Sequence, residues 1–336
     1  MHCRNAARAL IAATALAGAC GVSAASPPGG DTLHSWNIGP TKFAVMQFVR
    51  DVTKPGGPDF VPPEDRIAVF SHDGTLCPEL PAPAELAFLM DRIKALAPTH
   101  PRWKSKEPFR SALARNTKGL AAAGTKGIME LEAAAFAGLT TEEYESTVDH
   151  WLEKGRNQRL ARLYAQSALL PMLELLDFLR SGGFRIFIVV RGDAAFLRAW
   201  AERAYGVPPA QVIGSNVRTR YTLRKGTAVL VRRAEFDLLE DGPGRPQAIF
   251  RTIGRRPIAA FGSSDADMEM LEWVEKGPGK HLVLLVHHTN GGNEFAYDRK
   301  GVFGRLDKGL VIARKRGWTI ADMTKDWNRF FPKPGQ

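Results

Sequence analysis

Short apolar runs, each bounded by polar or turn-forming residues, occur along the second half of this chain and once before it. Runs of this length without polar alternation predict strands that are buried on both faces of a sheet. The clearest of them are residues 67–70, 184–190, 257–261 and 281–286. Between them lie stretches with helical spacing of apolar positions, namely 171–180, 194–205 and 268–275. The pattern therefore predicts an α/β fold, a mostly parallel sheet with helices on both faces.

Two further elements follow from the same pattern. Residues 212–213 predict a short strand, and residues 218–230 alternate through Lys225-Gly226, which predicts a β-hairpin. The run at 281–286 is predicted to be the last strand of the sheet.

The region from residue 84 to residue 167 has helical spacing and no convincing strand. Its predicted helices are 84–97, 108–123, 128–137 and 141–154. Thr140 followed by Glu143 is a capping-box pattern at the start of the last of these. We therefore expect a helical insert over 84–167 within an α/β core made of 26–83 and 168–336.

The first 25 residues have the composition of a secretory signal peptide. Arg4 and Arg8 precede an apolar stretch, residues 9–19, and small residues follow it. The stretch is too short to span a membrane. We expect removal of residues 1–25 and a periplasmic or secreted protein. Lipidation of Cys20 is an alternative, because small residues precede this cysteine.

The chain has 336 residues and a formal net charge of +11, which falls to +9 without the leader. A basic surface can attract nucleic acid or anionic lipid. The basic residues are nevertheless scattered or in short pairs, and no Lys/Arg run is interleaved with aromatic residues. We expect neither a nucleic-acid interface nor a membrane span, and the sequence specifies no protein partner. Cys77 would be the one thiol left after cleavage at residue 25.

The stretch 66–77 is the strongest candidate for chemistry. Its buried strand runs into Asp73-Gly74-Thr75, so it delivers a carboxylate into a glycine turn at the carboxyl end of a strand, where open α/β sheets bind ligands. The letters Ser71-His72-Asp73 suggest a hydrolase triad. Successive side chains of a strand point to opposite faces, however, so His72 is directed away from Ser71 and this interpretation is rejected.

These residues resemble the first motif of the haloacid dehalogenase (HAD) superfamily, an apolar strand followed by Asp-x-Asp-Gly-Thr. Later segments support the resemblance in the expected order, reading Tyr-Gly-Val-Pro-Pro-Ala-Gln-Val-Ile-Gly-Ser over 205–215, Ile-Gly-Arg-Arg-Pro-Ile-Ala-Ala-Phe-Gly over 253–262 and Gly-Trp-Thr-Ile-Ala-Asp-Met over 317–323. It extends from about residue 35 to about residue 332 and is similar to secreted bacterial HAD-like hydrolases related to phosphoserine phosphatase. It implies a HAD-like, Rossmann-type core with the helical insert as a cap domain.

The resemblance implies Mg²⁺-dependent hydrolysis of a small phosphorylated molecule through an aspartyl-phosphate. The family's second aspartate, a general acid/base, is Asp73 here, and Thr75 matches the substrate-binding threonine of the motif. The nucleophile position, however, holds Ser71. A serine hydroxyl is a weak, uncharged metal ligand and needs an adjacent base to act as a nucleophile.

The second family motif ends a strand with Ser or Thr, which holds a phosphoryl oxygen. That position is Val190 here, followed by Arg191 and Gly192 in place of two glycines. Asp193 directly precedes a predicted helix and is expected to be its N-cap. It places an anion near amides that could otherwise receive phosphate. Arg191 could pair with Asp193 or reach for a substrate.

The third and fourth motifs are partly retained. Arg245 stands where the family has a lysine that pairs with the nucleophile and the phosphate. Asp265 and Asp267 remain on the loop of the fourth motif, and Ser263 occupies a position at which many members have a metal-binding aspartate. With Asp73 they imply a possible but weak Mg²⁺ site.

We therefore expect a HAD-family hydrolase homologue that is inactive or strongly impaired as a phosphatase, because its nucleophile, a phosphate-holding hydroxyl and the lysine are all replaced. The alternative is an active hydrolase with altered chemistry that uses Asp73, Asp265 and Asp267.

Overall fold

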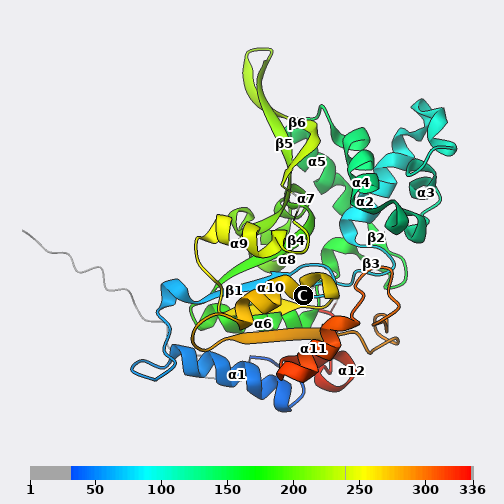
Figure 1. Ribbon diagram of the computed structural model, residues 1–336. Helices are drawn as coiled ribbons and strands as arrows, with labels where there is room; N and C mark the ends of the chain where they lie inside the picture. The colour runs from blue at the N-terminus through cyan, green and yellow to red at the C-terminus, as the bar shows by residue number, and fades with distance from the viewer. Residues whose placement is uncertain (1–31, 239, 334–336) are drawn as a thin grey trace, which may run out of the picture.

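A seven-stranded sheet forms the centre of the protein, whose structure is a computed structural model that describes residues 32–238 and 240–333 (Figure 1). The strand order is β6-β5-β4-β1-β7-β8-β9. All neighbouring pairs are parallel except β5 and β6. The strands are β1 (Ile67–Ser71), β4 (Arg185–Asp193), β5 (Val212–Arg224), β6 (Thr227–Leu238), β7 (Ala259–Gly262), β8 (Leu282–His287) and β9 (Thr319–Asp322). The predicted α/β fold is confirmed.

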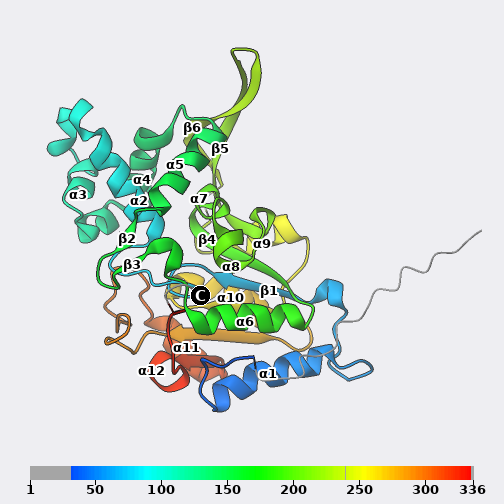
Figure 2. The same cartoon turned by 180° about the vertical axis from the view of Figure 1, so that it is seen from behind.

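Helices cover both faces of the sheet (Figures 1 and 2). Alternate side chains of β1 enter two different hydrophobic clusters, because successive residues of a strand point to opposite faces. Ala68 and Phe70 join the cluster that contains α1 (Pro40–Thr53) and α6 (Leu170–Ser181). Ile67 and Val69 join the other cluster. Its helices are α9 (Gly244–Ile253), α10 (Met268–Glu275) and α11 (Lys308–Arg316).

A group of helices follows β1 and lies beyond the carboxyl ends of the central strands (Figure 1). It comprises α2 (Ala84–Leu96), α3 (Phe109–Leu113), α4 (Thr117–Phe136) and α5 (Thr141–Leu152), and a small ribbon of β2 (Arg156–Asn157) and β3 (Arg162–Leu163) follows. The capping box of Thr140 and Glu143 is present. The predicted break after residue 123 is confirmed as a kink at Gly124, where two helical segments meet within α4, whereas the predicted helix 108–123 is interrupted between α3 and α4. The domain limits at 83/84 and 167/168 stay predictions.

The hairpin turns at Lys225-Gly226 as predicted, but it is longer than predicted. The strand expected at 212–213 is the beginning of β5, which runs without a break to Arg224. The predicted helix 194–205 is divided into α7 (Ala194–Arg198) and α8 (Ala201–Tyr205). Trp200 leaves the helical conformation there, and its buried ring packs against His72 and Tyr205.

The strand at 281–286 is not the last one, because β9 pairs with it at the edge of the sheet. A short helix, α12 (Met323–Asp326), follows β9. No helix in the described part of the chain is both long and apolar enough to cross a membrane. The predicted signal peptide and Cys20 lie outside the described residues.

Candidate active site

The loop after β1 begins at Ser71 and turns sharply at Gly74. The Gly74 amide donates to the Cys77 carbonyl at 2.8 Å, and its φ of +75° is a left-handed conformation that favours glycine. A Cβ here would lie 2.5 Å from both Glu79 Oε1 and Ser263 Oγ. The turn therefore requires glycine for space as well as for backbone angle. Thr75, predicted to bind substrate, is fully buried and its Oγ1 has no hydrogen-bond partner among the described residues.

Ser71 faces a cationic side chain that is already paired. Arg245, on α9, is 2% exposed and donates from Nη1 to Ser71 Oγ at 3.5 Å. The same nitrogen donates to Asp267 Oδ1, and Glu240 Oε1 lies 3.5 Å from Arg245 Nε. The guanidinium thus lies between two buried carboxyl groups. Its charge is balanced by protein groups before any anionic ligand enters.

Both oxygens of Asp267 have protein donors. Oδ1 accepts from Arg245, and Oδ2 accepts from the Ser263 and Ser264 amides at 2.8 and 2.9 Å. Burial alone would raise the pKa of Asp267, but Arg245 and these amides hold it below its ordinary value. Asp267 is therefore an ionised partner of Arg245.

The Asp265 carboxylate is hydrogen-bonded to the start of α11. Its Oδ1 accepts from the Asp307 and Gly309 amides at 3.0 and 2.7 Å, and Oδ2 accepts from the Lys308 amide at 3.3 Å. These amides surround the first turn of α11, where the positive end of the helix dipole stabilises a carboxylate. Asp265 thus acts here as a cap for α11.

Asp73 lies beside a buried histidine. His72 Nδ1 is 3.0 Å from Asp73 Oδ1, and His72 Nε2 is 3.0 Å from the Tyr205 hydroxyl. Burial alone would lower the pKa of His72, but Cys77 and Asp73 raise it to about 10. Burial raises the pKa of the Cys77 thiol. The hydrogen-bond partners of His72 are Asp73 and Tyr205, so its ring is directed away from Ser71, as the strand geometry predicts. His72 thus holds the Asp73 carboxylate in place.

The end of β4 is occupied by an acidic side chain from the first turn of α2. The Glu85 carboxylate accepts from the Asp193 amide at 2.8 Å. It also lies directly over Gly192, where a Cβ would be 1.6 Å from Glu85 Oε2. Burial, together with Glu132 and Asp193, raises the pKa of Glu85 well above its ordinary value. Glu85 therefore fills the place beside Val190 that the family resemblance assigns to a phosphoryl oxygen.

Asp193 caps α7 as predicted, but Arg191 is not its partner. Asp193 Oδ1 accepts from the Ala195 amide at 3.0 Å, and Oδ2 is 2.6 Å from Arg232 Nη2. Arg232 comes from β6, and its guanidinium lies 3.8 Å from the centre of the Tyr144 ring. Arg191 is exposed and lies at the rim of the cavity. The anion at this helix is therefore neutralised by a residue almost forty positions away.

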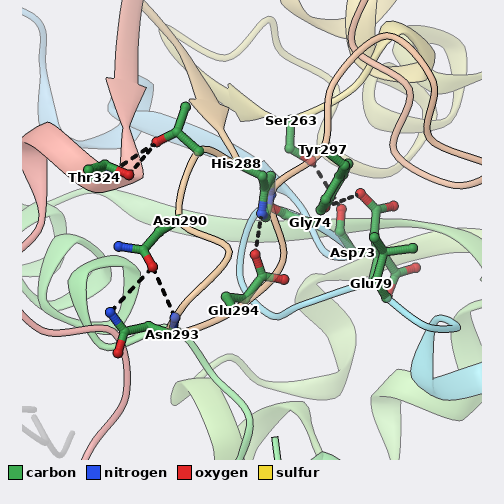
Figure 3. A network of polar contacts seen from close by, with 12 residues as sticks. Asp73, Gly74, Glu79, Ser263, His288, Asn290, Asn293, Glu294, Tyr297 and Thr324 are labelled. Carbon is green, nitrogen blue, oxygen red and sulfur yellow. Dashed lines mark hydrogen bonds and ion pairs between the residues drawn. The ribbon is translucent and has the colours of Figure 1, made fainter. Parts of the chain in front are cut away.

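A polar network holds the other side of the Gly74 turn (Figure 3). His288 Nε2 is 2.7 Å from the Gly74 carbonyl, and Nδ1 is 2.8 Å from Glu294 Oε2. The Tyr297 hydroxyl donates to Glu79 Oε1 at 2.6 Å and its ring stacks on His288. Burial raises the pKa of Glu79 to about 7. This network fixes the loop after β8 against the turn that carries Asp73.

These elements enclose a cavity of about 350 Å³ between the end of the sheet and the helical region. Its roof is apolar and includes Leu86, Leu89, Leu120, Ile128 and Phe303. Its charged lining consists of Asp73, Glu79, Glu85, Glu240, Asp241, Arg191 and Arg245. Carboxyl groups outnumber guanidinium groups, although the whole chain is basic. Among the predicted site residues, Ser71, Asp73, Val190, Arg191, Gly192 and Arg245 line this cavity, whereas Thr75, Asp265 and Asp267 do not.

The residues present do not form a carboxylate site for Mg²⁺. The oxygens of Asp265 and Asp267 are occupied by protein donors, and Ser263 Oγ donates to the Asp73 carbonyl at 3.3 Å. Within the described residues, the only three acidic, His or Cys side chains whose ligand atoms lie within 4.8 Å of one another are His72, Asp73 and Cys77. Mg²⁺ prefers oxygen ligands, so this group does not suit it.

Several residues of the site were not predicted. Glu85 was not predicted as a site residue because an acid in the first turn of a helix is ordinarily explained by its favourable interaction with the helix dipole. Glu79, Glu240 and Arg232 lie in segments without a motif. A charged residue next to apolar neighbours was the one signal that could have marked Glu79.

Comparisons with known proteins bear on the fold. No family model and no curated protein matches the chain. A conserved protein of unknown function from Anaerococcus prevotii is 14% identical, with a TM-score of 0.52 over 83% of this chain and 90% of that one. A HAD family hydrolase from Salmonella enterica serovar Typhi is 14% identical, with a TM-score of 0.39 over 66% and 62% of the two chains. A phosphoserine phosphohydrolase-like protein from Francisella tularensis is 12% identical, with a TM-score of 0.40 over 67% and 89%.

At this identity such similarity concerns the fold alone. The parallel sheet, with the Asp-Gly-Thr turn at the end of its central strand β1 and helices inserted directly after it, is the arrangement that the motif order predicts. The chain therefore has a HAD-like α/β fold. Its activity has to be argued from its own side chains.

Proposed function

We propose that this protein is a HAD-like hydrolase homologue that binds a small molecule and is inactive, or strongly impaired, as a phosphatase. The observation that carries the proposal is Ser71, whose hydroxyl lines the cavity at the end of β1 and accepts from Arg245 at 3.5 Å. Its other polar neighbour is the Asp267 carboxylate. Against the effect of burial, the pKa of this carboxyl is lowered by Arg245 and by hydrogen bonds from the Ser263 amide and the Ser71 hydroxyl, so it is a weak base for removing the Ser71 proton. Covalent phosphoryl transfer to this position therefore lacks an activated nucleophile.

The residues that would surround a bound phosphoryl group support the same proposal. Val190 offers no hydrogen bond, and Glu85 occupies the Asp193 amide. Arg245 is already paired with the ionised Asp267 before a ligand binds. A phosphate dianion would thus enter a cavity whose one other guanidinium among the described residues, that of Arg191, lies at the rim. We infer that a neutral small molecule with an apolar part fits the cavity better than a phosphomonoester, because the raised pKa values of Glu79, Glu85 and Glu240 leave these groups largely uncharged.

The second candidate is an enzyme of altered chemistry that uses Asp73. The observation in its favour is that Asp73 lines the cavity, is 29% exposed and is held by His72. Against it, Asp265 and Asp267 are bonded to α11 and to Arg245, so Mg²⁺ binding with Asp73 would require both to exchange partners.

Turnover of p-nitrophenyl phosphate with Mg²⁺ separates the two candidates. We expect no turnover for the wild-type protein or for Asp73→Asn. Turnover in the usual enzyme range of about 1–10³ s⁻¹ that disappears in Asp73→Asn would overturn the proposal in favour of the second candidate. The turnover of Ser71→Asp, measured in the same assay, shows how much activity is regained when the carboxylate of the nucleophile position is restored.

Ligand preference is tested with two probes of similar size. We expect 2-phenylethanol to raise the melting temperature more than phenyl phosphate does, because the cavity has an apolar roof and its Glu79, Glu85 and Glu240 carboxyl groups offer hydrogen bonds with little charge. The opposite order would contradict the inferred ligand class while leaving the absence of turnover intact.

Export remains a proposal that rests on the first 25 residues. Cell fractionation with N-terminal sequencing should find a chain that begins near residue 26 outside the cytoplasm. An intact Met1 on soluble cytoplasmic protein from the native cell would contradict it.

A further inference from the structure

The hairpin of β5 and β6 projects beyond the sheet and the helical region (Figures 1 and 2). Its register places Tyr221 opposite Leu230 and Leu223 opposite Ala228. Residues that are directly opposite in a ladder lie on the same face, and so do residues two positions apart. These four side chains therefore form one contiguous apolar patch near the tip.

The patch is exposed to solvent, whereas the other face of the hairpin contacts the segment 138–140. Tyr221, Leu223 and Leu230 are 66%, 62% and 44% exposed. On the opposite face Arg224 donates to the Gly138 carbonyl at 2.6 Å, and Val231 is buried at a bridge with Thr140. The patch thus belongs to an anchored ribbon and has no cover in the described part of the protein.

The distal part of the hairpin is basic. Residues 219–234 contain five Arg or Lys residues and no Asp or Glu. Arg224 and Arg232 are paired with Glu143 and Asp193. The remaining three are Arg220, Lys225 and Arg233, which are exposed and make no ion pair within the described residues. The register places Lys225 in the turn next to the patch, Arg220 on the face opposite to the patch, and Arg233 beyond Arg232 toward the base of the hairpin.

We propose that the tip of this hairpin is a docking surface for an anionic phospholipid membrane. A lipid surface offers both partners that the tip lacks, an apolar interior for Leu223 and Leu230 and anionic head groups for Lys225 in the turn and for the long side chain of Arg220. Tyrosine is suited to the boundary between the two, because its ring is apolar and its hydroxyl polar. The contact is peripheral and requires no spanning helix.

Two other occupants fit less well. A second copy of the chain would bring a second cationic tip against the first, and like charges at close range are unfavourable. Single-stranded nucleic acid binds through stacking on aromatic side chains, and the patch has only one aromatic ring beside aliphatic ones. Charge complementarity together with the aliphatic patch therefore favours lipid.

Vesicle co-sedimentation of the purified protein tests the proposal. We expect at least tenfold tighter partitioning to vesicles of phosphatidylcholine and phosphatidylglycerol than to phosphatidylcholine alone, and a loss of this preference at high salt. The double variant Tyr221→Ser/Leu223→Ser should reduce binding about tenfold. Arg220→Gln/Lys225→Gln should reduce it roughly fivefold for each cation removed.

The matched control is Phe250→Ser, which removes an apolar side chain that is 57% exposed on α9, far from the tip of the hairpin (Figure 1). It should leave partitioning unchanged, and the melting temperatures of all variants should stay close to that of the wild type because the replaced side chains are exposed. Equal binding by the double apolar variant and the wild type would overturn the proposal. So would a hairpin-dependent dimer in solution, or binding of a labelled oligonucleotide in place of vesicles.

Discussion

Arg245 illustrates how a charged side chain is retained in the interior of this protein. Its guanidinium is almost fully buried between Asp267 and Glu240 and reaches Ser71. Removing one member of such a group leaves the other charges buried without compensation, which costs more than the pair itself contributes. The residue therefore stabilises the fold in addition to lining the cavity.

We predict that Arg245→Met lowers the free energy of unfolding by about 3–5 kcal/mol, measured by chemical denaturation. The control is Arg255→Met, which breaks the exposed pair of Arg255 with Asp65. That change should cost no more than about 1 kcal/mol, because exposed ion pairs are screened by water. Similar losses for the two variants would show that Arg245 is not a compensated buried charge.

A second prediction concerns partial reversal of the site. Ser71→Asp should increase Mg²⁺ affinity, because it adds a charged oxygen ligand beside Asp73. It should give little turnover, because Glu85 still occupies the Asp193 amide. Ser71→Asp/Glu85→Ala should turn over p-nitrophenyl phosphate measurably faster than Ser71→Asp at saturating Mg²⁺.

The control for this comparison is Glu85→Ala alone, which should remain inactive and folded. Equal rates for the single and double variants would mean that Glu85 does not obstruct the site. In that case the nucleophile would be the decisive defect, and our account of the end of β4 would be wrong.

At the scale of single elements, local sequence signals account for several boundaries. The Thr140 hydroxyl accepts from the Glu143 amide at 3.1 Å, and Glu143 Oε2 accepts from the Thr140 amide at 2.7 Å. This reciprocal capping begins α5, which carries Tyr144 and Val148 into the core. The same turn supports the base of the hairpin through the bridge of Thr140 with Val231.

We predict that Thr140→Ala destabilises the protein by about 1 kcal/mol, the usual cost of losing an N-cap. Thr147→Ala is the matched control, since Thr147 is half-buried within the same helix and its hydroxyl bonds the Glu143 carbonyl. It should be neutral or slightly stabilising, because alanine favours helices. Thermal unfolding of both variants decides the matter, and equal effects would refute a special role for the cap.

The buried strands were predictable because each is a continuous apolar run, and the register of β1 against β4 and β7 confirms their central place. By contrast, β9 was missed because it is a short, half-buried edge strand. The helix α9 was missed because Pro246 stands in its first turn, where proline is tolerated without interrupting a helix.

The candidate site was predictable only where a motif carries it. Ser71, Asp73 and Arg245 stand at motif positions, and the structure brings them to one cavity. Glu85 and Arg232 reach the end of β4 from positions 108 and 39 residues away from Asp193. Pairing at such separations depends on the tertiary fold, so no local pattern could reveal it. Asp265 was predicted as a metal ligand, and the structure shows it bonded to α11.

At the scale of the whole molecule, a chain of net positive charge holds several acidic side chains in its interior. The net charge is +11, yet Glu79, Glu132 and Glu240 are all buried. Burial raises the pKa of Glu132 and of Glu240 to about 8 and that of Glu79 to about 7. The folded protein therefore holds protons at neutral pH that the unfolded chain releases, and its stability should depend on pH in a defined direction.

We predict that stability falls as pH rises from about 5 to 8 and that Glu132→Gln reduces this fall. Glu132 has an ordinary pKa of 4.5 and a folded pKa of about 8, raised by burial and by Asp193 against the opposing effect of Arg232. Below pH 4.5 the carboxyl is protonated in both states, so its contribution to stability is fully present. Between 4.5 and 8 only the folded state keeps the proton, and the contribution declines by up to about 1.4 kcal/mol per pH unit.

The control is Glu130→Gln, an exposed change on the same helix. Denaturation series from pH 5 to 9 should show that stability falls less steeply with pH for Glu132→Gln than for the wild type or this control. Parallel curves for all three proteins would mean that Glu132 is not held protonated in the fold.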